Sequence, residues 1–165
     1  MPPSRVIATW FGAGLLRPAP GTWGTLAALP VAWGLHVLGG FWLLAAATGV
    51  VFFLGWWVTV IETRGLDDPD PSEIVIDEVA GMWLALWPVS LGAMMQGVAI
   101  TALWPGWVVA FVAFRAFDIL KPGPVGWADR LHTPLGVMLD DIIAGAFAAL
   151  VVIVLAVLAH GVMGL

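Results

Sequence analysis

The sequence has no cysteine and no tyrosine, and only 10% of its 165 residues are charged. The absence of cysteine excludes disulfides, thiolate-bound zinc and a cysteine nucleophile. Six basic residues against eleven acidic ones give a net charge of −5, so we expect no nucleic-acid partner, because phosphate backbones require a basic face. A soluble domain carries about 25% charged residues, and the shortage here therefore argues against a chain that folds in water.

Apolar side chains are what the sequence has in abundance. Hydrophobic residues make up 61% of the chain, tryptophan occurs eleven times, and the mean hydropathy is +1.01. Charged residues are absent from three long stretches, 18–61, 79–114 and 142–165. A helix that crosses a bilayer needs about 20 apolar residues, and each stretch is long enough for at least one. The pattern predicts a single membrane domain over residues 1–165, an all-α polytopic helical bundle. The short apolar run at the N-terminus is unlike a signal peptide.

Glycine and proline divide these stretches further. Gly39 and Gly40 interrupt the first, and residues 88–97 begin with proline and contain several polar and small residues, which we interpret as a linker. Pro105 and Gly106 predict a kink. About five hydrophobic segments result, which we place at 24–38, 41–61, 74–87, 98–118 and 141–160. The first of these is about 22 Å long at 1.5 Å per residue, so it is either a thin span or a re-entrant helix.

A topology of five segments gathers the basic residues on one face. The two interruptions on the other face, and the C-terminus, carry no charge. Because lysine and arginine favour the cytoplasmic side of short loops, we predict that the basic face is cytoplasmic. The residues on it are Arg5, Arg17, Arg64, Arg115, Lys121 and Arg130.

The same topology brings the carboxylates to that face. Loop acids such as Asp67 and Asp70 are typical of a solvated turn, but five others directly adjoin apolar helices: Asp77, Glu78, Asp118, Asp140 and Asp141. A carboxylate at the edge of the hydrocarbon region is costly unless it is paired or binds a cation. The three nearby bases cannot pair all of them, and oxygen ligands select Mg²⁺, Ca²⁺ or Mn²⁺ over zinc. The alternative is that each acidic doublet caps a helix N-terminus.

Two features next to these acids indicate anion binding. Arg115 and Lys121 could grip an anion bridged to a metal, or Arg115 could simply pair with Asp118 on the same helix face. Arg130 follows in the same polar segment. The sequence PGTWGT at 20–25 begins a helix whose backbone N–H groups can form an anion pocket, which makes candidate phosphate ligands of Thr22, Gly24 and Thr25. A capped turn is the alternative.

Four stretches in chain order together resemble the phosphatidylglycerophosphatase A family: GAGLLRPAPGTWGTLAALP (12–30), IVIDEVAGMW (74–83), FRAFDILKPGPVGWADR (114–130) and GVMLDDIIAGAF (136–147). Members are bacterial membrane enzymes that remove phosphate from phosphatidylglycerophosphate to give phosphatidylglycerol. The resemblance covers nearly the whole chain. It implies an all-helical, Mg²⁺-dependent phosphatase of phospholipid biosynthesis in the bacterial cytoplasmic (inner) membrane, with its active site facing the cytoplasm.

The resemblance also assigns residues. It places the acidic motif positions of the family on Asp77, Glu78, Asp118, Asp129, Asp140 and Asp141. We predict that all of these except Asp129 bind the metal, and that Asp129 is accessory. The catalytic carboxylates are predicted to be Asp77, Asp118 and Asp141. On the phosphate side, the resemblance supports Thr22, Arg115 and Lys121, to which we add Gly24, Thr25 and Arg130. Attack by water and attack by a carboxylate, through an aspartyl-phosphate, both remain open.

Other functions are compatible with parts of this pattern. Another small membrane enzyme of phospholipid headgroup chemistry is one alternative, although the D-G-x₂-A-R…G-x₃-D-x₃-D pattern of CDP-alcohol phosphotransferases is absent. A carboxylate-lined cation transporter is the second, and it predicts acids near the bilayer midplane instead of at segment ends. A homo-oligomer is compatible with either.

Overall fold

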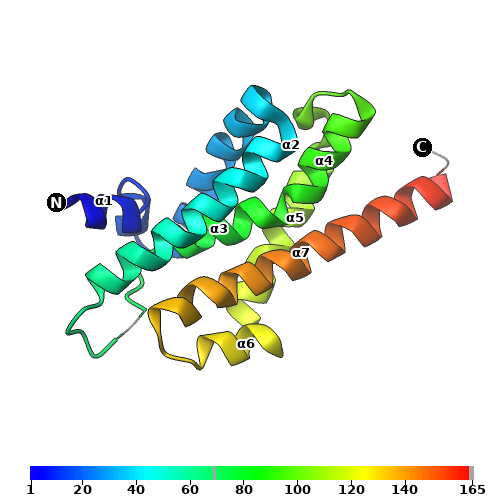
Figure 1. Cartoon of the computed structure of the whole chain (residues 1–165). Coiled ribbons are helices and arrows are strands. Elements are labelled where there is room, and N and C mark those ends of the chain that lie inside the picture. Colours follow the sequence, from blue (N-terminus) through cyan, green and yellow to red (C-terminus); the bar gives the residue numbers. More distant parts are fainter. Residues whose placement is uncertain (69, 164–165) are drawn as a thin grey trace.

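The computed structural model describes residues 1–68 and 70–163, and that part of the chain is helical without any strand (Figure 1). The predicted all-α fold is confirmed. In chain order the elements are α1 (Pro3–Ala8), η1 (Ala13–Leu15), α2 (Pro20–Glu62), α3 (Ile76–Ala85), α4 (Trp87–Gln96), η2 (Ile100–Leu103), α5 (Trp104–Leu120), α6 (Pro124–Asp129) and α7 (Pro134–Met163), where η marks a 3₁₀ helix.

Helix α2 is a hairpin of two helical halves. The backbone leaves the helical region at Gly39 (φ −152°, ψ 17°) and Gly40 (φ 63°, ψ −156°), as the glycine pair predicts. Gly40 lies at a positive φ that side-chain-bearing residues rarely adopt. In Figure 1 the first half of α2 runs to one end of the bundle and the second half returns beside it. The first half begins at Pro20, four residues before the predicted start, because proline fits the first helical turn.

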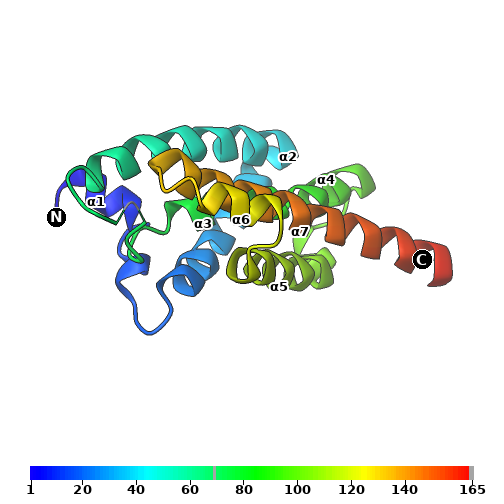
Figure 2. The same cartoon turned by 90° about the horizontal axis from the view of Figure 1, so that it is seen from below.

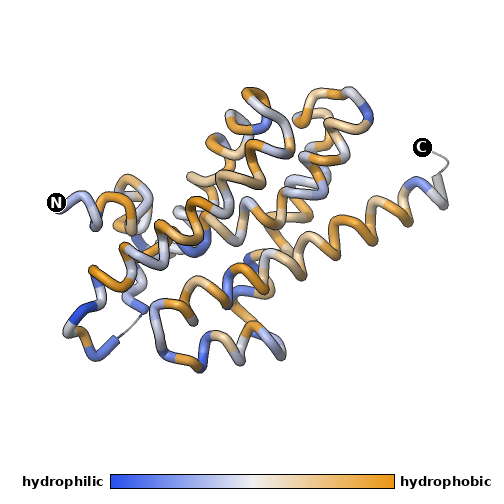
Figure 3. The backbone as a smooth tube through the Cα atoms, viewed as in Figure 1, coloured by the Kyte–Doolittle hydropathy of each residue, from blue (hydrophilic) through white to orange (hydrophobic). Residues whose placement is uncertain are grey.

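Four helical stretches are long and apolar enough to cross a membrane: Pro20–Glu62, Ile76–Gln96, Ile100–Leu120 and Pro134–Gly161. Since the first folds back at its glycine pair, the described chain contains five helical segments, in agreement with the predicted number. Figure 3 shows the helices as largely hydrophobic, with hydrophilic residues concentrated at the end that holds the loops around residues 62–75 and 121–133.

Two predictions about proline were wrong. Residues 88–97 do not form a linker, because α4 extends from Trp87 to Gln96 and ends at Gly97 in a left-handed conformation (φ 64°). Pro105 does not kink a helix, because it lies in the first turn of α5 after the 3₁₀ helix η2. In both cases the proline occupies a first turn, where its missing N–H group has no intrahelical partner to lose.

Helix α3 lies at the centre of the bundle and packs against α2 and α7 (Figures 1 and 2). In its most apolar 18-residue segment, the stretch formed by α3 and α4 is 56% buried inside the protein. The corresponding segments of the other three membrane-length stretches are only 17–22% buried. A Cβ atom on Gly81 of α3 would lie 2.5 Å from the main-chain oxygen of Asp141. A Cβ on Gly145 of α7 would lie 3.0 Å from the carbonyl carbon of Gly81. Only glycine therefore permits the two backbones to approach this closely.

The glycine crossing brings two acids together. Asp77 precedes Gly81 by four residues, and Asp141 precedes Gly145 by four residues. Four residues correspond to about one helical turn, so each acid lies one turn before the contact, on the face of its helix that carries the glycine. The crossing therefore accounts for the approach of the two carboxylates, whose oxygen atoms lie within 4.8 Å of each other.

Candidate active site

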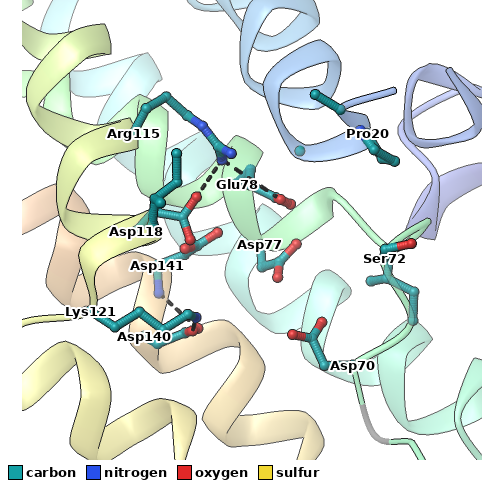
Figure 4. Close-up of a pocket in the computed structure, with 14 residues that line it drawn as sticks. Pro20, Asp70, Ser72, Asp77, Glu78, Arg115, Asp118, Lys121, Asp140 and Asp141 are labelled. Carbon is teal, nitrogen blue, oxygen red and sulfur yellow. Dashed lines mark hydrogen bonds and ion pairs between the residues drawn. The ribbon is translucent and has the colours of Figure 1, made fainter. Parts of the chain in front are cut away.

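Three carboxylates from two helices converge beside the α3–α7 crossing. Asp77 and Glu78 lie in the first turn of α3, and Asp141 lies in α7. Each offers an oxygen atom, and these atoms all lie within 4.8 Å of one another. Asp77 and Asp141 are buried, with exposed fractions of 6% and 2%, and Glu78 is largely enclosed. Figure 4 shows the three side chains facing a common space.

The three side chains carry oxygen atoms that have no hydrogen-bond partner. They are Oδ1 of Asp77, Oε2 of Glu78 and Oδ2 of Asp141, all fully enclosed. An unpaired buried carboxylate oxygen is costly, and three of them close together repel one another. A hard divalent cation with oxygen ligands is the group that removes this penalty. The donor set therefore fits Mg²⁺, Mn²⁺ or Ca²⁺, the ions that the sequence predicts.

The two other predicted metal ligands have basic partners. Asp118 accepts a hydrogen bond from Nη1 of Arg115. Oδ2 of Asp140 lies 2.5 Å from Nζ of Lys121, and Oδ1 of Asp140 accepts a hydrogen bond of 3.0 Å from the backbone N–H of Asp141. The structure thus brings all five predicted ligands to one pocket, but it divides them into three with unpartnered oxygens and two with matched charges.

The basic side chains each join two acids. Nη1 of Arg115 pairs with Asp118 and lies 3.9 Å from Oε1 of Glu78, and its enclosed Nε has no partner. Nζ of Lys121 lies 2.9 Å from Oδ1 of Asp129 in addition to its contact with Asp140. Burial lowers the pKa of Lys121, but hydrogen bonds and the negative charges of Asp129 and Asp140 outweigh it and raise that pKa above its usual value. Lys121 therefore stays charged.

A pocket of about 290 Å³ contains this constellation. Its walls come from α3, α5, α7, the loop before α3 and the start of α2 (Figure 4). The lining residues are Ala19, Pro20, Gly21, Asp70, Ser72, Ile74, Asp77, Glu78, Arg115, Asp118, Ile119, Lys121, Asp140 and Asp141.

The predicted phosphate ligands on α2 do not line this pocket themselves. Gly24 faces α3, where a Cβ would lie 2.6 Å from Cβ of Val75. The buried hydroxyl of Thr25 donates a 2.7 Å hydrogen bond to the carbonyl of Gly21 in its own helix. Thr22 is half-buried in the first turn, outside the pocket lining. Arg130 is exposed and also lies outside it. The start of α2 lines the pocket only through Pro20 and Gly21, which precede the predicted phosphate ligands.

Sequence reasoning missed Gly21 and Asp70. A Cβ on Gly21 would press against Oε1 of Glu78 and lie 3.1 Å from Nη1 of Arg115, so only glycine allows α2 to begin this close to the site. The proline–glycine pair at 20–21 was the signal that could have identified Gly21, because the helix begins there. Asp70 lines the pocket, although the sequence of its loop is typical of a solvated turn. Its position depends on how the loop folds over α3, which no local pattern reveals.

The fold and the site define an all-α protein with membrane-length helices and a buried acidic cluster beside basic side chains. The chain belongs to the phosphatidylglycerophosphatase A family, whose model matches residues 6–156. It is therefore a phosphatase, a hydrolase of phosphate monoesters.

Three curated relatives cover most of the chain. Phosphatidylglycerophosphatase A of Haemophilus influenzae is 36% identical over 152 residues, which cover 91% of this chain and 86% of the relative. Phosphatidylglycerophosphatase A of Escherichia coli K12 is 35% identical over 149 residues, covering 89% and 80%. A Bacteroides thetaiotaomicron protein, provisionally named a phosphatidylinositol-3-phosphatase, is 33% identical over 154 residues, covering 90% and 91%. No solved structure matches the chain.

Proposed function

We propose that this phosphatase hydrolyses phosphatidylglycerophosphate to phosphatidylglycerol and inorganic phosphate with the help of Mg²⁺. The observation that carries the proposal is the set of three converging, unpartnered carboxylate oxygens in the pocket. The names of two relatives supply the substrate, and all three relatives are named for a phosphate monoester on a lipid headgroup.

Asp77, Glu78 and Asp141 would hold the cation. When bound, Mg²⁺ would supply positive charge for phosphate oxygens and lower the pKa of a bound water. A phosphate monoester carries a charge of about −1.5 to −2 at neutral pH, so the uncompensated acids would repel it. Asp118 and Asp140 adjoin the ligands and are held in place by Arg115 and Lys121.

The substrate phosphate would be bound from the opposite side of the pocket. Arg115 lines the pocket, where its guanidinium group would bind a phosphate oxygen. At the start of α2 the backbone N–H groups of Gly21 and Thr22 lie in the first turn, where no intrahelical acceptor exists. Lys121 retains a third N–H group after binding its two acids. Gly24 and Thr25 contribute by holding α2 against α3.

The attacking group is one of two kinds. Asp77, Asp118 or Asp141 accepts a proton from the attacking water, or one of them attacks phosphorus and releases the alcohol. Rapid-quench labelling with radioactive headgroup phosphate separates these routes, because a carboxylate nucleophile leaves acid-stable label that hydroxylamine removes. Water attack leaves the protein unlabelled.

Phosphate release by purified protein tests the proposed activity. We expect release from phosphatidylglycerophosphate with Mg²⁺ and none after EDTA, with activity restored by added Mg²⁺. Phosphatidylinositol 3-phosphate serves as the second substrate, because one relative carries that name. Asp67→Asn is the matched control, since Asp67 is an exposed loop acid outside the pocket lining. Absence of EDTA-sensitive release from either lipid would refute the proposal.

The location of the pocket supports a cytoplasmic active site in the bacterial inner membrane. The pocket lies where α2, α3 and α5 begin or end, so a lipid whose acyl chains remain in the bilayer would place its phosphate there. Basic residues flank the helices at this end, including Arg17 before α2, Arg64 after it and Lys121 after α5. Such residues favour the cytoplasmic side.

A further inference from the structure

Two of the pocket walls belong to helices that are far apart in the sequence, α2 and α5. The start of α2 and the end of α5 both line the pocket, and the Arg115 side chain of α5 lies against Gly21 of α2. Helix α3 packs against both, and α5 also packs extensively against α7. Figure 2 shows the first half of α2 and α5 along the same side of the molecule. The pocket is an open cavity, and α5 forms one of its walls.

One face of α5 connects the pocket to the bilayer. Val108, Val112, Arg115 and Ile119 are spaced by four, three and four residues, which places them on one helical face. Arg115 and Ile119 line the pocket. Val112 and Val108 are exposed, by 59% and 52%, and lie about 4.5 and 10.5 Å further along the helix axis at 1.5 Å per residue. The face changes from cationic at the pocket to apolar within the membrane-spanning stretch.

Helix α7 lacks such continuity, although it also contributes acids to the pocket. The next residues on the Asp140 face, Ile143 and Phe147, pack against the hydrophobic core. Exposure on α7 resumes at Leu150, more than two turns beyond the acids. An apolar chain attached to a phosphate in the pocket therefore has a continuous exposed surface along α5 and none along α7.

We propose that an acyl chain of the substrate lipid lies along Val112 and Val108 of α5 while the headgroup phosphate reaches Arg115. The inference rests on the proposed phosphatase function and specifies how that site receives a lipid. It identifies the ligand of the α5 face as the hydrocarbon part of a glycerophospholipid. A substrate without long acyl chains does not use this surface.

A bulky substitution on the α5 face tests the acyl-chain contact. Val112→Trp is compared with the conservative Val112→Leu and with Val50→Trp, which alters an equally exposed valine on the second half of α2, away from the pocket. We expect Val112→Trp to lower kcat/KM for a dioleoyl substrate by roughly tenfold or more. Hydrolysis of a water-soluble dibutanoyl analogue should stay unchanged, and both controls should resemble wild type. Equal loss on both substrates, or no loss on either, would overturn the proposal.

Photolabelling tests the same contact without relying on turnover. A phospholipid phosphate with a diazirine in one acyl chain is expected to label the α5 peptide that contains Val108 and Val112, and excess unlabelled substrate should reduce this label. Label spread evenly over α5, α7 and the second half of α2 would contradict the α5 track. If the wild type releases phosphate from no lipid, the proposed function fails, and the labelling pattern still decides where a lipid binds.

Discussion

The carboxylates in the pocket are of two kinds, distinguished by their partners. Asp77 and Asp141 are buried with an unpartnered oxygen each, whereas Asp140 is bound to Lys121 and to the backbone of Asp141. The first kind has the chemistry expected of a ligand for an external cation. The second kind orients its neighbours, as residues around metal ligands commonly do.

Substitution by asparagine separates these roles. We expect Asp141→Asn to abolish phosphate release and Mn²⁺ binding, because the amide removes the charge that the cation neutralises. Asp140→Asn should retain a site weakened by roughly 10–100-fold, the range for a residue that positions a ligand. Electron paramagnetic resonance titration with Mn²⁺ measures both, with Asp67→Asn as the control. Equal loss in Asp140→Asn and Asp141→Asn would make Asp140 a ligand, as the sequence predicts.

At the scale of elements, the crossing of α3 and α7 sets the distance between acids from two helices. Gly81 and Gly145 allow the backbones to touch one turn beyond Asp77 and Asp141. The crossing therefore connects helix packing to the geometry of the site, since any separation of the two helices also separates the carboxylates.

A methyl group at this crossing should damage the metal site. Gly81→Ala would place a Cβ 2.5 Å from the main-chain oxygen of Asp141 and 2.6 Å from Cε2 of Phe114, so α3 and α7 must move apart. We expect weaker Mn²⁺ binding and lower thermal stability in detergent. Gly34→Ala is the matched control, because a Cβ there meets no atom within 4 Å and alanine favours a helix. Wild-type Mn²⁺ affinity in Gly81→Ala would contradict the proposed role of the crossing.

The sequence predicted the elements better than their ends. Charge-free stretches and the Gly39–Gly40 pair located five segments, because the bilayer requirement for apolar residues is a local property. Pro88 was misinterpreted as part of a linker. A proline can either end a helix or lie in the first turn of the next one, and the outcome depends on where the preceding helix ends. Here α3 ends at Ala85, so Pro88 lies in the first turn of α4. Likewise, the sequence identified the five acids of the site because each directly adjoins an apolar helix. Which of them lack partners depends on tertiary contacts such as Lys121 to Asp140.

For the whole molecule, the distribution of polar ends predicts its orientation in the membrane. The chain has no native cysteine, so single cysteines report on accessibility directly. We expect Asp67→Cys, in the loop after α2, to react with an impermeant maleimide only from the cytoplasmic side. Gln96→Cys, exposed at the end of α4, should react only from the other side. Reaction of both from the same side would contradict the five-segment topology.

The three unpartnered carboxylates also predict that a bound cation stabilises the folded protein. They belong to two helices, so a cation bound among them joins α3 to α7 and removes their mutual repulsion. A ligand present at 100 times its Kd adds about 2.7 kcal/mol to the free energy of unfolding. We expect the thermal midpoint in detergent to rise with Mg²⁺ and to fall with EDTA.

Asp77→Asn offers the decisive comparison, because it removes one of the repelling charges. It should make the metal-free protein more stable than the metal-free wild type and should abolish the stabilisation by Mg²⁺. Asp67→Asn should change neither, and a metal-free Asp77→Asn that is less stable would contradict the repulsion. Magnesium supply would then govern how long the enzyme survives in the membrane as well as how fast it works, and depletion of the ion would remove the catalyst itself.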